Sequence, residues 1–155
     1  MPPVTLCVSA EDSGLLAELV TEYIATWGGA RRELDDDEVS FVASLSQESH
    51  PQLAGWVAIA DGYPCGCVLL LPGYSAESVE LAKLFVLPAY RRLGVARVLV
   101  ETAHAWSREH GYTRAYLIVQ DVREEAISLY QRAGYKDTVV TPIEGYVEMC
   151  IRLGE

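Results

Sequence analysis

Positive charge is scarce in this sequence. Its 155 residues include 12 lysines and arginines against 22 aspartates and glutamates, which gives a formal net charge of −10. A surface with that balance repels nucleic acids and anionic membranes, so we expect neither as a partner. It favours cationic or amine-bearing partners instead.

Long apolar runs and an export leader are absent too. The first residues, MPPVTLCVSAEDSG, contain no basic segment followed by an apolar stretch, which argues against a signal peptide. The run CGCVLLLPG is too short to cross a bilayer. We therefore predict a cytoplasmic protein. Because no repeat, linker or low-complexity segment interrupts the chain, residues 1–155 are expected to form a single domain.

The four cysteines, at positions 7, 65, 67 and 150, do not have the spacing of a metal site. Cys65 and Cys67 stand two positions apart on a predicted strand, so we expect both thiols on the same face of it. The three histidines are scattered and complete no ligand set. The sequence therefore predicts no metal, and buried thiols in a reducing compartment.

The hydrophobic periodicity predicts an α/β fold with mixed strand pairing. Helical spacing covers residues 14–27, 92–110 and 123–134, and a short helical or irregular segment extends to residue 49. A hairpin is expected around Asp61-Gly62, and further strand patterns cover residues 4–9, 78–88, 113–120, 135–140 and 146–153.

The segment YRRLGVA, residues 90–96, concentrates positive charge at the start of a predicted helix. It offers no Ser, Thr, Asp or Asn that could cap the helix, so the first amide groups are free to bind an anion. Gly94 lets the backbone approach a phosphate oxygen closely, and Ala96 is nearly as small. Neither a Walker loop nor a G-x-G-x-x-G pattern is present. The segment predicts a phosphate site of another kind.

The segment AISLYQRAGY places Tyr130 on the apolar face of the last predicted helix. A tyrosine directed inward needs a partner for its hydroxyl. Two interpretations are open at this point. Tyr130 is a core residue hydrogen-bonded to a backbone carbonyl, or its hydroxyl faces a cleft.

Over about residues 57–149 the chain resembles the GNAT superfamily of N-acetyltransferases. R-x-x-G-x-A at residues 91–96 is similar to the family's Q/R-x-x-G-x-G/A loop, which binds the pyrophosphate of acetyl-CoA. L-Y-x-x-x-G-Y at residues 129–135 is similar to a second family signature. The resemblance implies the GNAT fold, an α/β (α+β) arrangement with a mixed, mostly antiparallel twisted sheet. Six to seven strands, about four flanking helices and a splay between the central strands are expected.

The resemblance also implies the reaction and its cofactor contacts. The acetyl group of acetyl-CoA would pass directly, in a ternary complex, to a primary amine of a small molecule, amino acid or peptide. The backbone amide near Leu84 or Phe85 would polarise the thioester carbonyl, and Tyr130 would protonate the leaving thiolate. The residues expected to contact the cofactor are Leu84, Phe85, Val86, Arg91, Arg92, Leu93, Gly94, Val95, Ala96, Arg97, Arg123 and Tyr130.

Glu80 is the candidate base, because members of the superfamily often place a glutamate at this point of the strand. Burial between strands would raise its pKa towards a useful range. The alternative is an edge carboxylate that faces water, with a chain of waters taking the proton. Lys83 is interpreted as a solvated or salt-bridged strand residue. Arg123 stands where relatives frequently carry asparagine; it could reach a CoA phosphate, reach the acceptor, or point outward.

On the acceptor side, the resemblance implies walls formed by residues 23–38 and 141–146, with Tyr23, Glu144 and Tyr146 as candidate lining residues. The acidic run at residues 33–38 could attract a cationic amine, or it is a solvated run that caps a helix. The rival function is a non-catalytic acyl-CoA-binding sensor, which would need neither Tyr130 nor a base. An exposed edge along the last strand, YVEMCIRL, could form a homodimer seam.

Overall fold

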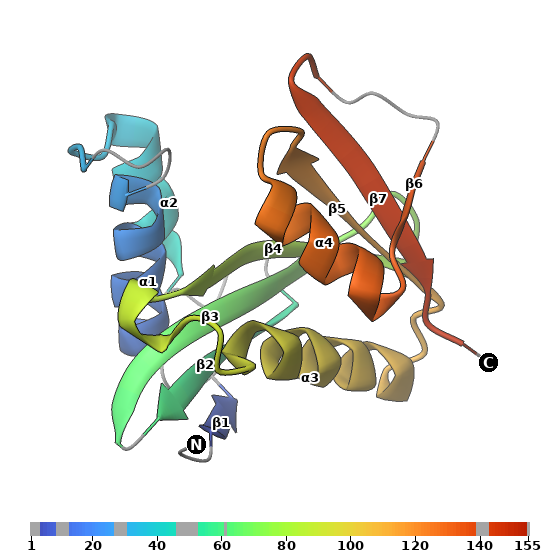
Figure 1. Ribbon diagram of the computed structural model, residues 1–155, viewed down its shortest axis with the longest axis horizontal. Coiled ribbons are helices and arrows are strands. Elements are labelled where there is room, and N and C mark those ends of the chain that lie inside the picture. The colour runs from blue at the N-terminus through green and yellow to red at the C-terminus, as the bar shows by residue number, and fades with distance from the viewer. Residues whose placement is uncertain are drawn as a thin grey trace.

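The computed structural model describes residues 4–8, 13–26, 31–45, 53–60, 62–138 and 143–154. One seven-stranded sheet has the order β1-β2-β3-β4-β5-β7-β6 (Figure 1). Its strands are β1 (Val4–Val8), β2 (Ala54–Ala60), β3 (Tyr63–Pro72), β4 (Ser78–Val86), β5 (Arg114–Gln120), β6 (Lys136–Asp137) and β7 (Tyr146–Arg152). The helices are α1 (Ser13–Thr26), α2 (Asp36–Ser44), α3 (Val95–Glu109) and α4 (Glu124–Ala133), with a 3-10 turn, η1 (Pro88–Tyr90).

The predicted fold class is confirmed. Only β4 and β5 run parallel, and the other neighbouring strands pair antiparallel. The four α-helices lie on the two faces of the sheet. Leu16 of α1 packs with Leu69 of β3, whereas Leu99 of α3 packs with Leu70. Because successive residues of a strand point to opposite faces, α1 and α3 cover opposite faces of the sheet.

The central strands separate soon after they meet. Parallel pairing between β4 and β5 joins Ser78 to Arg114, Val79 to Ala115 and Glu80 to Tyr116, and continues no further. Beyond these pairs the strands diverge, which opens the middle of the sheet (Figure 1). The splay expected from the family resemblance is therefore confirmed.

A β-bulge kinks β4 where it leaves β5. Leu69 of β3 pairs with Ala82, but Cys67 pairs with Phe85, so one residue of β3 stands opposite two residues of β4. The extra residue arises at Lys83, whose φ of 54° is left-handed. The thiol of Cys67 donates to the Lys83 carbonyl at 3.5 Å. The bulge leaves the backbone beside it without regular ladder partners.

The two neighbouring cysteines of β3 do not share a face, so that expectation is wrong. Cys65 belongs to the cluster under α3, and Cys67 belongs to the cluster under α1. The register between β2 and β3 shifts after Ala58, where one extra residue of β3 reverses the alternation. Both side chains are buried, as expected.

The helix after β4 begins later than predicted. Arg92 and Gly94 have left-handed φ values of 65° and 84°, so α3 starts at Val95 and not at residue 92.

The last strand also differs from its prediction. β7 pairs with β6 at Cys150 and Met149, so β7 is not the outermost strand of the sheet, and the homodimer stays a prediction. None of the helices in the described ranges is long and apolar enough to span a bilayer.

We predict that His104 makes folding sensitive to acid. Its Nε2 lies 2.8 Å from the Tyr135 hydroxyl, and burial lowers the pKa of His104 from 6.5 to about 4. Because the pKa of His104 in the folded protein lies below its unfolded value, the stability contributed by neutral His104 is fully present above pH 6.5. This stability is lost as the pH falls towards 4. Relative to a His104→Gln variant, the free energy of unfolding should fall by about 3 kcal/mol over that interval. Denaturant titrations at several pH values measure this, and a wild-type-to-variant difference independent of pH would contradict it.

Candidate active site

The splay between β4 and β5 opens two cavities on opposite sides of the sheet. The first, the α3–α4 cleft, has a volume of about 970 Å³ and is lined by the end of β4, the loop that follows, the start of α3 and most of α4. The second, the α1-side cavity, has a volume of about 350 Å³ and is lined by α1, β4, β5 and β7. The two linings share three residues, Leu84, Arg123 and Tyr130. The cavities therefore meet at the splay.

Every residue predicted to contact the cofactor lines the α3–α4 cleft except Leu93. Leu93 is half-buried and packs against the core. Its position between Arg92 and Gly94 explains the exception, because two left-handed residues turn the chain sharply there.

The loop into α3 leaves the first turn of the helix open. No side chain caps it, and a Cβ placed on Gly94 would meet no atom within 4 Å. The φ of 84° at Gly94 is a conformation that glycine adopts without strain. The Arg91 Nε donates to the carbonyl of Val86 at 2.9 Å and so ties the loop to the end of β4. The first residues of the helix line the cleft, so an anion there can bind their unpaired amides.

Two further arginines stand at this opening. Arg92 lies 3.7 Å from Glu125, and Arg97 lies 3.0 Å from Glu101 in the next helical turn. All four side chains are exposed, and such ion pairs contribute little to stability. Both guanidinium groups can therefore exchange these partners for the phosphates of a ligand.

Tyr130 is buried at the junction of the two cavities. Among the described residues its hydroxyl has no hydrogen-bond partner, so the structure does not support a core tyrosine bonded to a backbone carbonyl. Burial raises the pKa of Tyr130 strongly; nearby Tyr23 adds to the rise and Arg123 opposes it. The hydroxyl is therefore protonated at neutral pH and able to donate.

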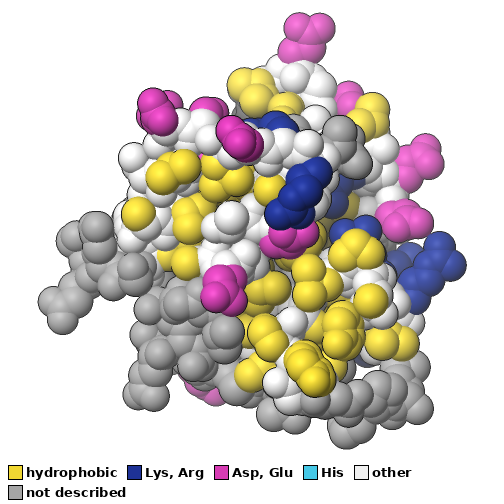
Figure 2. Space-filling view, turned by 90° about the vertical axis from the view of Figure 1, so that its left-hand side faces the viewer, with side chains coloured by type: hydrophobic (Ala, Val, Ile, Leu, Met, Phe, Trp, Pro, Cys, Tyr) yellow, Lys and Arg dark blue, Asp and Glu magenta, His cyan; other side chains and the backbone are white. Residues whose placement is uncertain are grey.

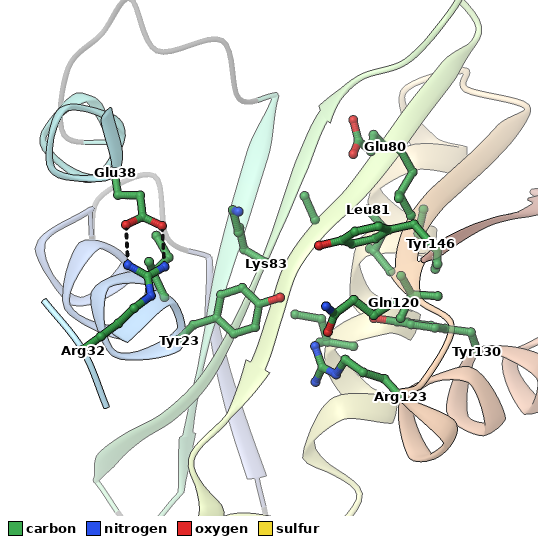
Figure 3. Close-up of a pocket in the computed structure, with 16 residues that line it drawn as sticks. Tyr23, Arg32, Glu38, Glu80, Leu81, Lys83, Gln120, Arg123, Tyr130 and Tyr146 are labelled. Atoms are coloured by element: carbon green, nitrogen blue, oxygen red, sulfur yellow. Dashed lines mark hydrogen bonds and ion pairs between the residues drawn. The ribbon is translucent and has the colours of Figure 1, made fainter. Parts of the chain in front are cut away.

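Polar side chains from three strands and two helical segments point into the α1-side cavity. Figure 3 shows the hydroxyls of Tyr23 and Tyr146, the Gln120 amide and the Arg123 guanidinium turned towards one another across it. Tyr23 and Tyr146 were predicted as lining residues, whereas Gln120 was not. Glu144 is exposed and does not line the cavity. The position of Gln120 at the end of β5, three residues before Arg123, is the feature of the sequence that could have indicated it as a lining residue.

Glu80 lines the α1-side cavity and is half-buried. Its pKa is raised, first by burial and further by the nearby Glu148 carboxylate, while Lys83 acts in the opposite direction. This is the direction that the sequence predicted for a base. A carboxylate with a raised pKa holds a proton more readily than a solvated one.

The acidic run before α2 caps that helix, as one of the two interpretations held. Asp35 accepts from the Glu38 amide, and Glu38 accepts from the Asp35 amide, both at 2.9 Å. Glu38 also accepts two hydrogen bonds from Arg32, at 2.8 and 2.7 Å (Figure 3). These bonds lower the pKa of Glu38 to about 2. Sequence reasoning missed this pair, because nothing in the acidic run indicates which carboxylate faces inward.

Comparisons with known proteins agree with this geometry. A family model described as the acetyltransferase (GNAT) family matches residues 15–135. The chain belongs to this family. It is 30% identical to the uncharacterized N-acetyltransferase YjgM of Escherichia coli (strain K12) over 142 residues, 86% of this chain and 82% of YjgM. It is 33% identical to human N-acetyltransferase 8 over 87 residues, 54% of this chain but only 38% of that protein.

Solved GNAT structures share the fold. YncA of Salmonella typhimurium with its cofactor acetyl-CoA has a TM-score of 0.75 at 18% identity, covering 99% of this chain and 95% of that one. PaiA N-acetyltransferase of Thermoplasma acidophilum in complex with coenzyme A has a TM-score of 0.71 at 19% identity, covering 97% and 99%. Since the homologues are named N-acetyltransferases, the chain is an acyltransferase of the GNAT family.

The unpartnered hydroxyl of Tyr130 predicts contrasting effects of two Tyr→Phe substitutions. Tyr130→Phe removes a hydroxyl without a partner, so the free energy of unfolding should stay within about 0.5 kcal/mol of the wild type or rise. Tyr135→Phe leaves buried His104 without its 2.8 Å partner and should cost about 1–3 kcal/mol. Urea titrations of both variants test this. A loss of similar size in Tyr130→Phe would show that its hydroxyl is held within the protein.

Proposed function

We propose that this GNAT protein transfers the acetyl group of acetyl-CoA directly to a primary amine. The observation that carries the proposal is the meeting of two cavities at Leu84, Arg123 and Tyr130. A donor in one cavity and an acceptor in the other reach each other only there. The neighbouring structures that contain coenzyme A or acetyl-CoA support the assignment of the donor.

The α3–α4 cleft fits the donor in both charge and shape. The uncapped amides of α3, the open space at Gly94 and the arginines around it suit a pyrophosphate. The edge of β4 that β5 leaves unpaired, along Leu84, Phe85 and Val86, suits the amides of the pantetheine arm, although the Val86 carbonyl already accepts from Arg91. When bound, acetyl-CoA supplies a thioester as the acyl donor. The bulge amide at Leu84 or Phe85 donates to its carbonyl oxygen and stabilises the oxyanion.

The chain's residues then move protons. As the amine nitrogen bonds to the carbonyl carbon and the carbon–sulfur bond breaks, the Tyr130 hydroxyl donates a proton to the departing sulfur. Glu80 takes the proton that the amine loses, directly or through water. No cysteine lines either cavity in the described ranges, and burial raises the pKa of Cys67 to about 12. Direct transfer is therefore favoured over a covalent acetyl-enzyme.

A non-catalytic acyl-CoA sensor is the less favoured function. Such a module would use the α3–α4 cleft alone. It would not require a second cavity that joins the first, nor a buried tyrosine hydroxyl without a partner at their junction.

We predict that Gly94→Glu abolishes acetyl-CoA binding and that Gly111→Glu does not. Both glycines have nearly the same left-handed φ, 84° and 85°, and both face open space, so the backbone strain is matched. Only Gly94 lines the cleft, where a carboxylate repels phosphate and fills the approach. Calorimetric titration with acetyl-CoA measures the difference. Equal binding by the two variants, or no binding to the folded wild type, would contradict the cofactor site.

For Glu80 we predict a role in the pH dependence of the rate. A base acts when deprotonated, so kcat/KM should rise with pH through the Glu80 pKa, which lies above its ordinary value of 4.5. Glu80→Gln should remove this rise and slow transfer roughly a hundredfold. Thiol release from acetyl-CoA in the presence of amines measures the rate, with the exposed Glu109→Gln as control. An unchanged pH profile in Glu80→Gln would assign the base to water.

A further inference from the structure

The α1-side cavity differs in charge from the chain around it. Its charged lining consists of three cations, Arg32, Lys83 and Arg123, and two carboxylates, Glu38 and Glu80, whereas the whole chain has a net charge of −10. Figure 2 shows the α1–α2 side of the molecule, where acidic side chains are dispersed and the basic ones lie in the right-hand half. The excess of positive charge in this cavity is a local feature.

One of the two carboxylates is already neutralised. Both oxygens of the Glu38 carboxylate accept a hydrogen bond from the Arg32 guanidinium, so the charges of these two residues cancel. Glu80, whose pKa is raised by burial, makes no ion pair with a described side chain. With Arg32 and Glu38 paired, two cations, Lys83 and Arg123, face one remaining carboxylate, Glu80, although the acidic run nearby suggested a site for cationic amines.

Lys83 is the clearest unpaired charge. Its side chain is half-buried, and Nζ lies 5.8 Å from the ring centroid of Tyr23 and 5.5 Å from that of Phe41. No carboxylate of the described residues lies within ion-pair distance of Nζ, so of the two expected alternatives the salt-bridged one is not found. Burial lowers the pKa of Lys83, while the Glu80 and Glu38 carboxylates, beyond ion-pair distance, act in the opposite direction. An ammonium in this setting gains most from an anion that enters the cavity.

Arg123 adds a second cation at the junction of the two cavities. Its guanidinium points into the α1-side cavity (Figure 3), and it forms no hydrogen bond or ion pair with another described side chain. Arg31 and Arg32, by contrast, both pair with carboxylates. The planar guanidinium matches the two oxygens of a carboxylate.

We propose that the acceptor is a small primary amine that also carries a carboxylate, which Lys83 and Arg123 bind while the amine faces Leu84. The inference rests on the proposed acetyl transfer and specifies its acceptor. A cavity of about 350 Å³ holds a molecule of amino-acid size. A polyamine is disfavoured, because its second ammonium would meet these two cations. The product keeps the carboxylate and loses the charge of the amine.

Matched acceptors test the proposal. The purified full chain, saturated with acetyl-CoA, is assayed with amino acids, their carboxamides and the corresponding decarboxylated amines. The carboxylate member should have a kcat/KM higher by roughly tenfold or more, since a hydrogen bond to a charged group contributes about 1.5–3 kcal/mol. Equal or faster reaction of the carboxamides and decarboxylated amines would overturn the proposal.

Variants then separate charge recognition from structure. Lys83→Gln and Arg123→Gln should each raise KM for the carboxylate acceptor roughly tenfold more than KM for its carboxamide. Because Arg123 also lines the α3–α4 cleft, the KM of Arg123→Gln for acetyl-CoA is measured separately. The exposed residues Lys136 and Arg114 line neither cavity, so Lys136→Gln and Arg114→Gln serve as matched controls. An equal rise in KM for carboxylate and carboxamide would assign Lys83 and Arg123 a structural role and overturn the proposal.

A different result would count against the proposed function itself. If acetyl-CoA binds to the wild type but no amine of any class releases thiol, acetyl transfer fails, and the acceptor inference fails with it. If neutral or cationic amines are acetylated efficiently, transfer stands and only the carboxylate inference is overturned.

Discussion

Incomplete hydrogen bonding between β4 and β5 is the constraint on which the site depends. The two strands pair at Ser78, Val79 and Glu80 and then separate. If parallel pairing continued, the sheet would separate the two cavities, and their lining residues would not meet. The separation brings the backbone at Leu84 within reach from both sides, and it leaves room for the Tyr130 hydroxyl. The cavities and their junction follow from this gap.

The bulge at Lys83 is what allows β4 to leave its neighbour and still pair with β3. The extra residue bends the strand. Because φ is left-handed at Lys83, its side chain and its carbonyl do not point in the directions they would have in a regular strand. In the proposed reaction, the same distortion would expose backbone amides to the donor and direct the Lys83 ammonium towards the acceptor. Positive charge, scarce in the chain, is placed in the loop before α3 and in the α1-side cavity.

Much of this arrangement could be predicted from the sequence, because local signals determine it. Periodicity indicates the helices and strands, and the uncapped RRLG segment indicates the anion site. The distribution of residues around bulges could not be predicted, since a register shift depends on which strands pair and where. That is why Cys65 and Cys67 fall on opposite faces and why the position of Lys83 was not foreseen. The partner of Glu38 depends on how the segment before α2 folds back, which no local pattern encodes.

The most direct test of the account is a crystal structure of the protein with a non-hydrolysable acetyl-CoA analogue. The account predicts the pyrophosphate on the amides at Gly94–Arg97, the carbonyl oxygen on the bulge amide at Leu84 or Phe85, and the Tyr130 hydroxyl within hydrogen-bond distance of the atom that replaces sulfur. An analogue bound elsewhere, or a Tyr130 hydroxyl bonded to the protein and turned away from the acyl group, would contradict it.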